Sequence, residues 1–107
     1  MNTPPSERMQ KLTALLERDP NDSFLLYAIA LEHKKAGEHA AALDWFDRVI
    51  AKDPGYSVAY HQAALTHEAA GDIAGAKTAY HSGIAAAEKK GDHHAADEMR
   101  GALSMIE

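Results

Sequence analysis

The chain has 107 residues, about the size of one domain, and its 46% hydrophobic and 25% charged residues are typical of a globular protein. Its formal net charge of −5 argues against a nucleic-acid or anionic-membrane surface, since both need clustered Lys and Arg. The lack of cysteine excludes disulfides, thiolate catalysis and cysteine-ligated zinc.

The start of the chain carries no visible targeting signal. Residues 1–7 contain neither a basic segment nor an apolar one, so no signal peptide is expected. No apolar run approaches the roughly 18–20 residues that a membrane-spanning helix needs. We therefore expect a soluble, cytoplasmic protein that does not bind membranes or nucleic acid.

The first predicted element is an amphipathic helix within residues 3–19. Either Thr3 or Ser6 is expected to cap it, because both hydroxyls can accept the free N–H groups of a first turn. Apolar residues then recur at helical spacing as far as about Arg18: Met9, Leu12, Leu15 and Leu16. This pattern predicts a helix that buries one face.

A second helix is predicted from about residue 24 to residue 36. Pro20 ends the preceding helix, and Asn21 or Asp22 is expected to cap the new one. The segment is apolar on most sides, so it must be contacted from at least two directions. Gly37 is expected to end it in the left-handed conformation.

The partner of this helix follows after a short turn and ends at Asp53-Pro54. Its apolar residues are Ala40, Ala41, Leu43, Phe46, Val49 and Ile50. Because the connecting turn is short, the two helices are predicted to lie antiparallel.

The same pattern of residues recurs 34 positions later, so that Asp19-Pro20 corresponds to Asp53-Pro54. Other matched pairs are Ala30 and Ala64, His33 and His67, Gly37 and Gly71, Ala42 and Ala76, Phe46 and Tyr80, and Ile50 and Ile84. A fixed period of this length indicates a repeat architecture, in which one helix pair cannot bury its own apolar face.

The second unit departs from the first in two ways. Gly83 stands where the first unit has Val49, and a glycine inside a helix costs about 1 kcal/mol relative to alanine. This cost predicts that another backbone passes close to Gly83. No proline closes the helix, which can therefore run on to Gly91.

A last helix is predicted within residues 92–107, with Asp92 as its cap. Its apolar residues form one stripe: Ala95, Ala96, Met99, Ala102, Leu103 and Ile106. A single apolar stripe with a polar remainder is typical of the helix that closes a helical solenoid.

The repeated residues resemble the tetratricopeptide repeat (TPR) family, including its small stand-alone bacterial members. The matching positions are Ala30 and Ala64, Gly37 and Gly71, Ala42 and Ala76, Phe46 and Tyr80, and Pro54. Departures are Leu26 for the usual Trp, His33 and His67 for Tyr, and Gly83 for Ala. The resemblance implies an all-α, TPR-type antiparallel helix-pair solenoid, a right-handed superhelix of about six helices.

This resemblance also implies a single TPR domain over residues 1–107. Residues 3–19 are interpreted as a half-repeat, although an unrelated N-terminal helix is the alternative. Residues 20–54 form the first unit and residues 55–91 the second, with an extended second helix. Residues 92–107 form the capping helix.

Members of the family are generally adaptors, so the resemblance implies a non-enzymatic scaffold that binds a peptide or helix of a partner protein. The corresponding concave groove would be lined by Phe24, Tyr27, Leu31, Lys34, Val58, His61, Leu65 and Glu68. Their spacing of three, four and three residues independently places each set on one helix face. Two alternatives stay open: the last helix folds back over some of these residues, or the chain is a self-assembly module, for example a homodimer, without a separate ligand.

Catalytic and metal sites are not expected. None of the 7 histidines forms the pair at positions i and i+4 that a helical metal site prefers, so neither a metal nor another cofactor is predicted. The sequence has no Gly-rich phosphate loop and no nucleophile elbow. Trp45, whose counterpart is Ala79, either packs on the N-terminal helix or forms a self-association patch.

Overall fold

A computed structural model describes residues 6–107 of the chain, and within this range it contains six α-helices and no strand. They are α1 (Glu7–Arg18), α2 (Ser23–Lys35), α3 (His39–Lys52), α4 (Ser57–Ala69), α5 (Ile73–Lys90) and α6 (His93–Ser104). The predicted all-α fold of about six helices is confirmed. Thr3, one of the two candidate caps of the first helix, lies outside the described residues.

Four of the six described helices, α1, α2, α5 and α6, begin at side chains that accept backbone N–H groups of the first turn. The hydroxyl of Ser6 accepts the N–H of Met9 at 3.0 Å. Asp22, rather than Asn21, caps α2, and Asp92 caps α6 as expected. Each cap satisfies donors that have no partner inside the helix, and this fixes where the helix starts.

Three helices end at glycines with positive φ. These angles are 76° at Gly37, 81° at Gly71 and 83° at Gly91, a region that glycine enters without steric cost. The last of the three closes α5, which has 18 residues against 14 for its counterpart α3, so the predicted extension is present.

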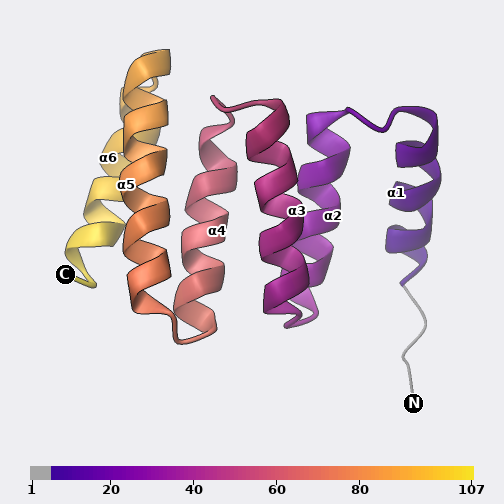
Figure 1. Cartoon of the computed structure of the whole chain (residues 1–107), viewed down its shortest axis with the longest axis horizontal. Helices are drawn as coiled ribbons and strands as arrows, with labels where there is room; N and C mark the ends of the chain where they lie inside the picture. The colour runs from indigo at the N-terminus through magenta and orange to yellow at the C-terminus, as the bar shows by residue number, and fades with distance from the viewer. Residues whose placement is uncertain (1–5) are drawn as a thin grey trace.

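The helices are arranged as antiparallel pairs that stand side by side in the same sense (Figure 1). We call α2, α4 and α6 the A layer, and α1, α3 and α5 the B layer; their outer surfaces are the A face and the B face. Consecutive helices pack against each other, and α6 also contacts α4. The molecule measures 38 × 30 × 17 Å, so its thinnest dimension spans only these two layers.

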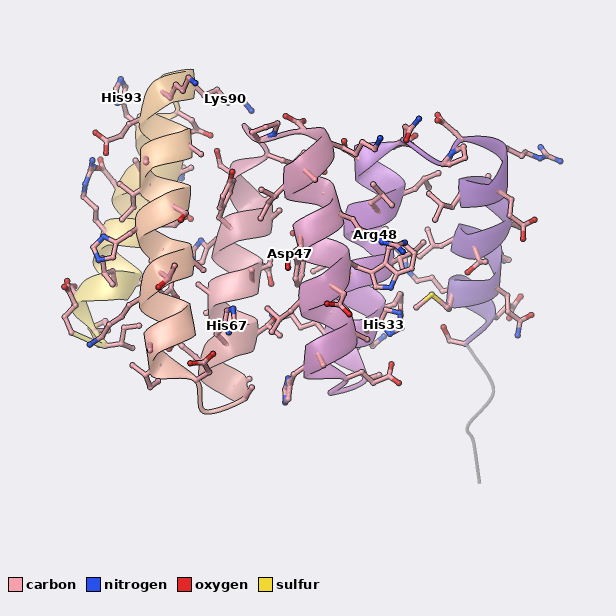
Figure 2. All side chains as sticks on the ribbon, in the orientation of Figure 1. His33, Asp47, Arg48, His67, Lys90 and His93 are labelled. Carbon is pink, nitrogen blue, oxygen red and sulfur yellow. The ribbon has the colours of Figure 1, made fainter. Side chains whose placement is uncertain are left out.

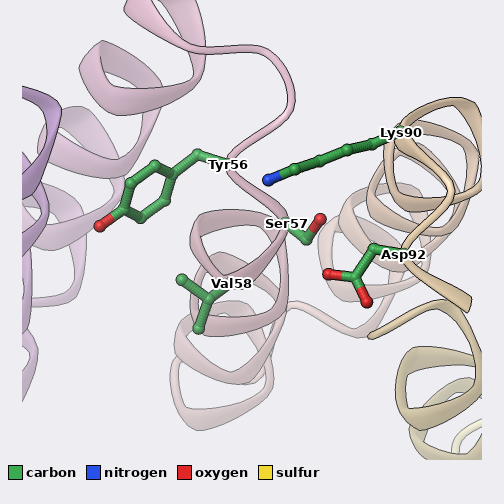
Figure 3. Close-up of a pocket in the computed structure, with 5 residues that line it drawn as sticks. All are labelled: Tyr56, Ser57, Val58, Lys90 and Asp92. Carbon is green, nitrogen blue, oxygen red and sulfur yellow. The ribbon is translucent and has the colours of Figure 1, made fainter. Parts of the chain in front are cut away.

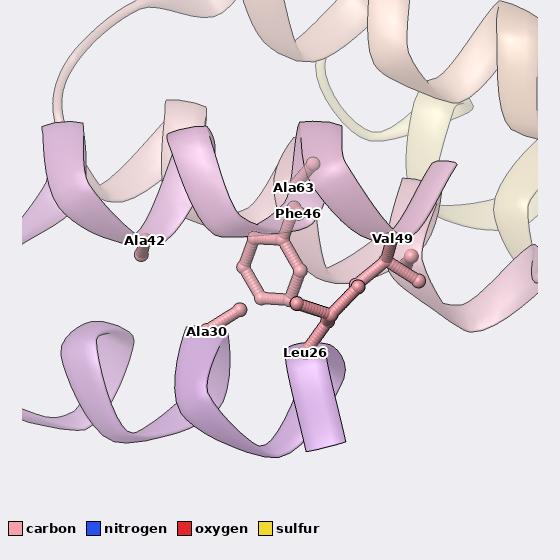
Figure 4. Packing of buried hydrophobic residues seen from close by; sticks show 7 residues of the cluster. Leu26, Ala30, Ala42, Phe46, Val49 and Ala63 are labelled. Atoms are coloured by element: carbon pink, nitrogen blue, oxygen red, sulfur yellow. The ribbon is translucent and has the colours of Figure 1, made fainter. Parts of the chain in front are cut away.

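The core runs continuously from one helix pair to the next. Phe46 of α3 is fully buried among Leu26 and Ala30 of α2, and Figure 4 shows its ring pointing at this helix. Ala59 and Ala63 of α4 belong to the same cluster. The second helix pair therefore covers the apolar side of the first, as the repeat pattern predicts.

The surroundings of Gly83 differ in part from the prediction. A Cβ atom at this position would lie 2.6 Å from Cβ of Tyr60 and 2.5 Å from Sδ of Met99. The nearest atoms therefore belong to side chains of two helices, α4 and α6, rather than to a backbone. Glycine is needed here because three helices meet at this point.

Candidate functional site

The predicted groove residues lie along the A layer on α2 and α4. The first residue of each set is exposed, Phe24 by 64% and Val58 by 43%, and the other six are half-buried. Phe24 and Val58 occupy equivalent positions of the two units, so the same apolar surface appears twice along this layer. The six half-buried residues are Tyr27, Leu31, Lys34, His61, Leu65 and Glu68.

Tyr27 and His61 take part in packing and present only part of their rings. The ring of Tyr27 lies 6.0 Å from that of Phe46 and 5.3 Å from that of Tyr56, measured between centroids. Burial, and then the proximity of Tyr56, raise the pKa of Tyr27 above its usual range. The ring of His61 meets Tyr80 edge-on at 5.7 Å.

Glu68 has a structural partner that the sequence did not predict. Its carboxylate accepts a hydrogen bond of 2.6 Å from the hydroxyl of Tyr80, and Tyr80 is fully buried. Burial first, and then this hydrogen bond, raise the pKa of Tyr80 well above its usual range. Glu68 therefore satisfies a core hydroxyl, and at most part of its carboxylate is available to a ligand.

Helix α6 extends the A layer beyond the predicted groove. A cavity of about 150 Å³ lies between α4 and α6 and is lined by Ser57, Val58, His61, Asp92, His94, Ala95, Glu98 and Met99. Three of these residues fall 34 positions after groove residues: Asp92 after Val58, Ala95 after His61 and Met99 after Leu65. The 34-residue spacing therefore indicates that α6 adds a third helix to the A layer, after α2 and α4. Helix α6 leaves Val58 exposed.

A second cavity, of about 220 Å³, opens beside Val58 (Figure 3). It is lined by Tyr56, Ser57, Val58, Lys90 and Asp92. Lys90 extends from the end of α5 across this cavity and donates to the carbonyl oxygen of Gly55 at 3.2 Å. The extra length of α5 therefore places a cation next to the exposed apolar side chain.

The two equivalent histidines are each held by the acidic residue that starts the next helix. Nδ1 of His33 lies 3.0 Å from a carboxylate oxygen of Glu38, and Nδ1 of His67 lies 3.1 Å from one of Asp72. In both units the carboxylate partner stands five residues after the histidine. Among residues 6–107, no group of three or more His, Asp and Glu side chains could hold a metal ion.

Trp45 packs on the N-terminal helix, which is the first of its two predicted roles. Its ring stacks on His33 with a centroid distance of 6.2 Å and an interplanar angle of 18°. The guanidinium of Arg48 lies 4.3 Å from the ring centroid, a cation–π arrangement. Met9 and Leu16 of α1 pack against the same cluster, so Trp45 joins α1 to α3.

These features define the class of the protein: an α-helical repeat scaffold whose A layer consists of the three helices α2, α4 and α6. No protein-family model matches the sequence, and no curated protein matches it. A tetratricopeptide repeat domain protein from Salinibacter ruber, solved by NMR, is 30% identical with a TM-score of 0.77 and covers 83% of this chain and 90% of its own. The chain belongs to the tetratricopeptide repeat family and is a protein-interaction scaffold.

Two further solved structures share the fold. One, from Bordetella parapertussis, is 29% identical with a TM-score of 0.83, over 94% of this chain and 88% of that chain. The other is PcrH in complex with the chaperone binding region of PopD, 20% identical with a TM-score of 0.83, over 92% of this chain and 74% of that one. No helix within residues 6–107 combines the length and apolar character that crossing a membrane requires.

Proposed function

We propose that the chain is a non-enzymatic scaffold that binds a peptide or helix of a partner protein along its A face. The observation that carries this proposal is the pair Phe24 and Val58, apolar side chains exposed at equivalent positions of neighbouring units. Water-exposed apolar side chains repeated along one layer favour an apolar ligand that crosses both units. PcrH, which has the same fold, is known in complex with a segment of another protein, and this supports the same class of ligand.

The proposed groove has an apolar floor with polar edges. Phe24, Leu31, Val58 and Leu65 supply the floor, while Tyr27, Lys34, His61 and Glu68 supply the edges. The cavities on either side of Val58 extend this surface toward α6 and Lys90. An amphipathic helix or an extended segment with apolar side chains fits such a surface.

The test is affinity capture from the native host with a doubly charged variant, Phe24→Glu with Val58→Glu. Both side chains are exposed, so the substitutions should leave the helical circular dichroism unchanged while reducing capture at least tenfold. Leu15→Glu is the matched control, because Leu15 is 48% exposed but lies on α1 in the B layer. Undiminished capture by the double variant would place the binding surface elsewhere.

Self-assembly is the second candidate function, and apolar residues near both ends of the described chain favour it. Leu15 on α1 and Met105 after α6 are 48% and 84% exposed. Apolar ends of this kind could pair between copies without any foreign ligand. Sedimentation over a dilution series separates the two functions, because a monomer at micromolar concentration would remove the self-assembly hypothesis.

A further inference from the structure

The B face contains two grooves that the 34-residue repeat makes equivalent. The first groove runs between α1 and α3 over α2, and the second runs between α3 and α5 over α4. Residues 34 positions apart occupy corresponding places in the two grooves, so the chain offers an internal comparison of one geometry with two sets of side chains.

In the first groove, the chain supplies its own occupant. The ring of Trp45 stacks on that of His33. The guanidinium carbon of Arg48 lies 4.3 Å from the centroid of the Trp45 ring. Figure 2 shows Arg48 on the side of α3 that faces α1, with His33 nearby. A cavity of about 330 Å³ lies toward the Pro20 end, lined by Leu16, Pro20, Leu26, Arg48, Ala51 and Lys52.

In the second groove, both parts of this occupant are missing. Ala79 stands in place of Trp45, and Ser82 in place of Arg48. A cavity of about 430 Å³ is open there, lined by Asp47, Ile50, Tyr60, Ala63, His67, Gly75, Thr78, Ala79 and Ser82. The counterpart of His67 in the first groove is His33, which Trp45 covers.

The ring platform of the second groove is already in place. His67 is fixed by its contact with Asp72, as His33 is by Glu38. Gly75 allows this position, because a Cβ atom there would lie only 2.5 Å from Nδ1 of His67. An incoming ring would therefore meet an imidazole that needs no rearrangement, which lowers the entropic cost of binding.

The second groove also carries a negative charge at a position that is uncharged in the first. Asp47 stands where the first groove has Thr13. Within residues 6–107, Asp47 forms no hydrogen bond or ion pair. Figure 2 shows Asp47 on α3, which borders the groove, and His67 on α4, which forms its floor. Burial first, and then the nearby Asp44, raise the pKa of Asp47, while His67 lowers it. A cation brought next to Asp47 would relieve this unfavourable environment.

We propose that the B-face groove between α3 and α5 binds an aromatic side chain of a partner polypeptide, with an adjacent Lys or Arg of that partner placed at Asp47. The partner supplies the ring and the cation that Trp45 and Arg48 supply in the first groove. Because these two residues are three positions apart on a helix, a helical segment with Trp followed three residues later by Arg has the required spacing. This site lies on the face opposite to the proposed peptide groove and does not depend on it.

The probe is the capped peptide acetyl-Trp-Ala-Ala-Arg-amide, titrated into the ¹⁵N-labelled full chain and followed by amide chemical shifts. The expected result is saturable shifts at His67, Thr78 and Ala79. The same peptide with Ala in place of Trp should produce none. Absence of shifts at millimolar peptide would overturn the proposal, and so would shifts confined to Val58 and His61, which instead report the A face.

Variants locate the site more closely. Ala79→Trp should occupy the groove from within, as Trp45 does, and abolish the shifts, whereas Ala74→Trp, on the exposed first turn of α5 outside the cavity, should preserve them. Asp47→Asn should weaken binding about twofold to fivefold, the usual range for an exposed ion pair, without affecting a peptide that has Ala in place of Arg. Binding that survives Ala79→Trp would overturn the proposal, as would groove shifts that depend on protein concentration alone, since these would make a second copy the occupant.

Discussion

The two grooves of the B face share their backbone plan and their histidine–carboxylate pair, but only in the first does a side chain of the chain itself cover the histidine. The difference resides in two positions, Trp45 and Arg48 against Ala79 and Ser82. In the first groove Trp45 packs against a cluster that Leu12 of α1 shares with α2, and Arg48 lies over the ring of Trp45. The same repeat geometry thus serves stability in one unit and leaves an open surface in the next.

The interiors of the two units differ in a related way. The first unit combines Leu26 with Val49, and the second combines Tyr60 with Gly83. Cβ of Tyr60 and the sulfur of Met99 lie within 2.6 Å of the place where a Cβ atom of residue 83 would be. The second unit therefore has a smaller side chain on its second helix, at Gly83, and a larger one on its first, at Tyr60. The two helices pack together in both units.

The largest expected effect comes from removing the occupant of the first groove. Trp45→Ala should lower the free energy of unfolding by about 3 kcal/mol, at the low end for a buried Trp because this side chain is only half-buried. Urea denaturation followed by circular dichroism measures it. A loss below about 0.5 kcal/mol, which is typical of surface substitutions, would contradict the assigned role of Trp45 in joining α1 to α3.

A somewhat smaller loss is expected when the second unit is given the residue of the first. Gly83→Val should destabilise the fold by about 2 kcal/mol, since the added atoms overlap with Tyr60 and Met99. Gly101→Val is the matched control, because a Cβ at Gly101 on α6 meets no atom within 4 Å. Equal stability of the two variants in thermal unfolding would show that the three helices do not meet closely at Gly83.

The smallest effect concerns the hydroxyl that distinguishes Tyr80 from its counterpart Phe46. Tyr80→Phe should cost about 1 kcal/mol, because the hydrogen bond to Glu68 is lost. The pKa of Tyr80 is raised on folding, so the folded state keeps a proton that the unfolded state loses above about pH 10. Stability should therefore fall as the pH rises from 9 to 11.

Urea midpoints across this pH range, with tyrosinate absorbance as a second readout, measure this fall. It should be smaller in Tyr80→Phe, although burial also raises the pKa values of Tyr27, Tyr56 and Tyr60, which keep part of the dependence in the variant. An identical pH dependence in both proteins would argue against a raised pKa at Tyr80.

Much of the fold could be predicted from the sequence because its signals are local. Asp22 and Asp92 as caps, the left-handed Gly37 and the run of α5 to Gly91 each depend on a few neighbouring residues. The 34-residue period then dictated which helices pair and in what order. Together these signals were sufficient for the architecture.

Features that depend on contacts between helices were less accessible. The bond from Tyr80 to Glu68 joins residues 12 apart, and nothing local marks Glu68 as anything but a groove residue. The open cavity beside Ala79 results from a missing side chain, and its size is set by helices that must first be placed. The contacts that require glycine at position 83 come from side chains of α4 and α6, and the sequence could not predict them for the same reason.

The 17 Å thickness of the molecule has a consequence for α4, which contributes Val58 and His61 to one surface and Tyr60 and His67 to the other. A single helix about 10 Å across is the only partition between the two bordering cavities. Two ligands bound on opposite faces would both contact α4. A tilt or shift of α4 that improves the fit of one ligand would therefore change the shape of the other ligand's cavity.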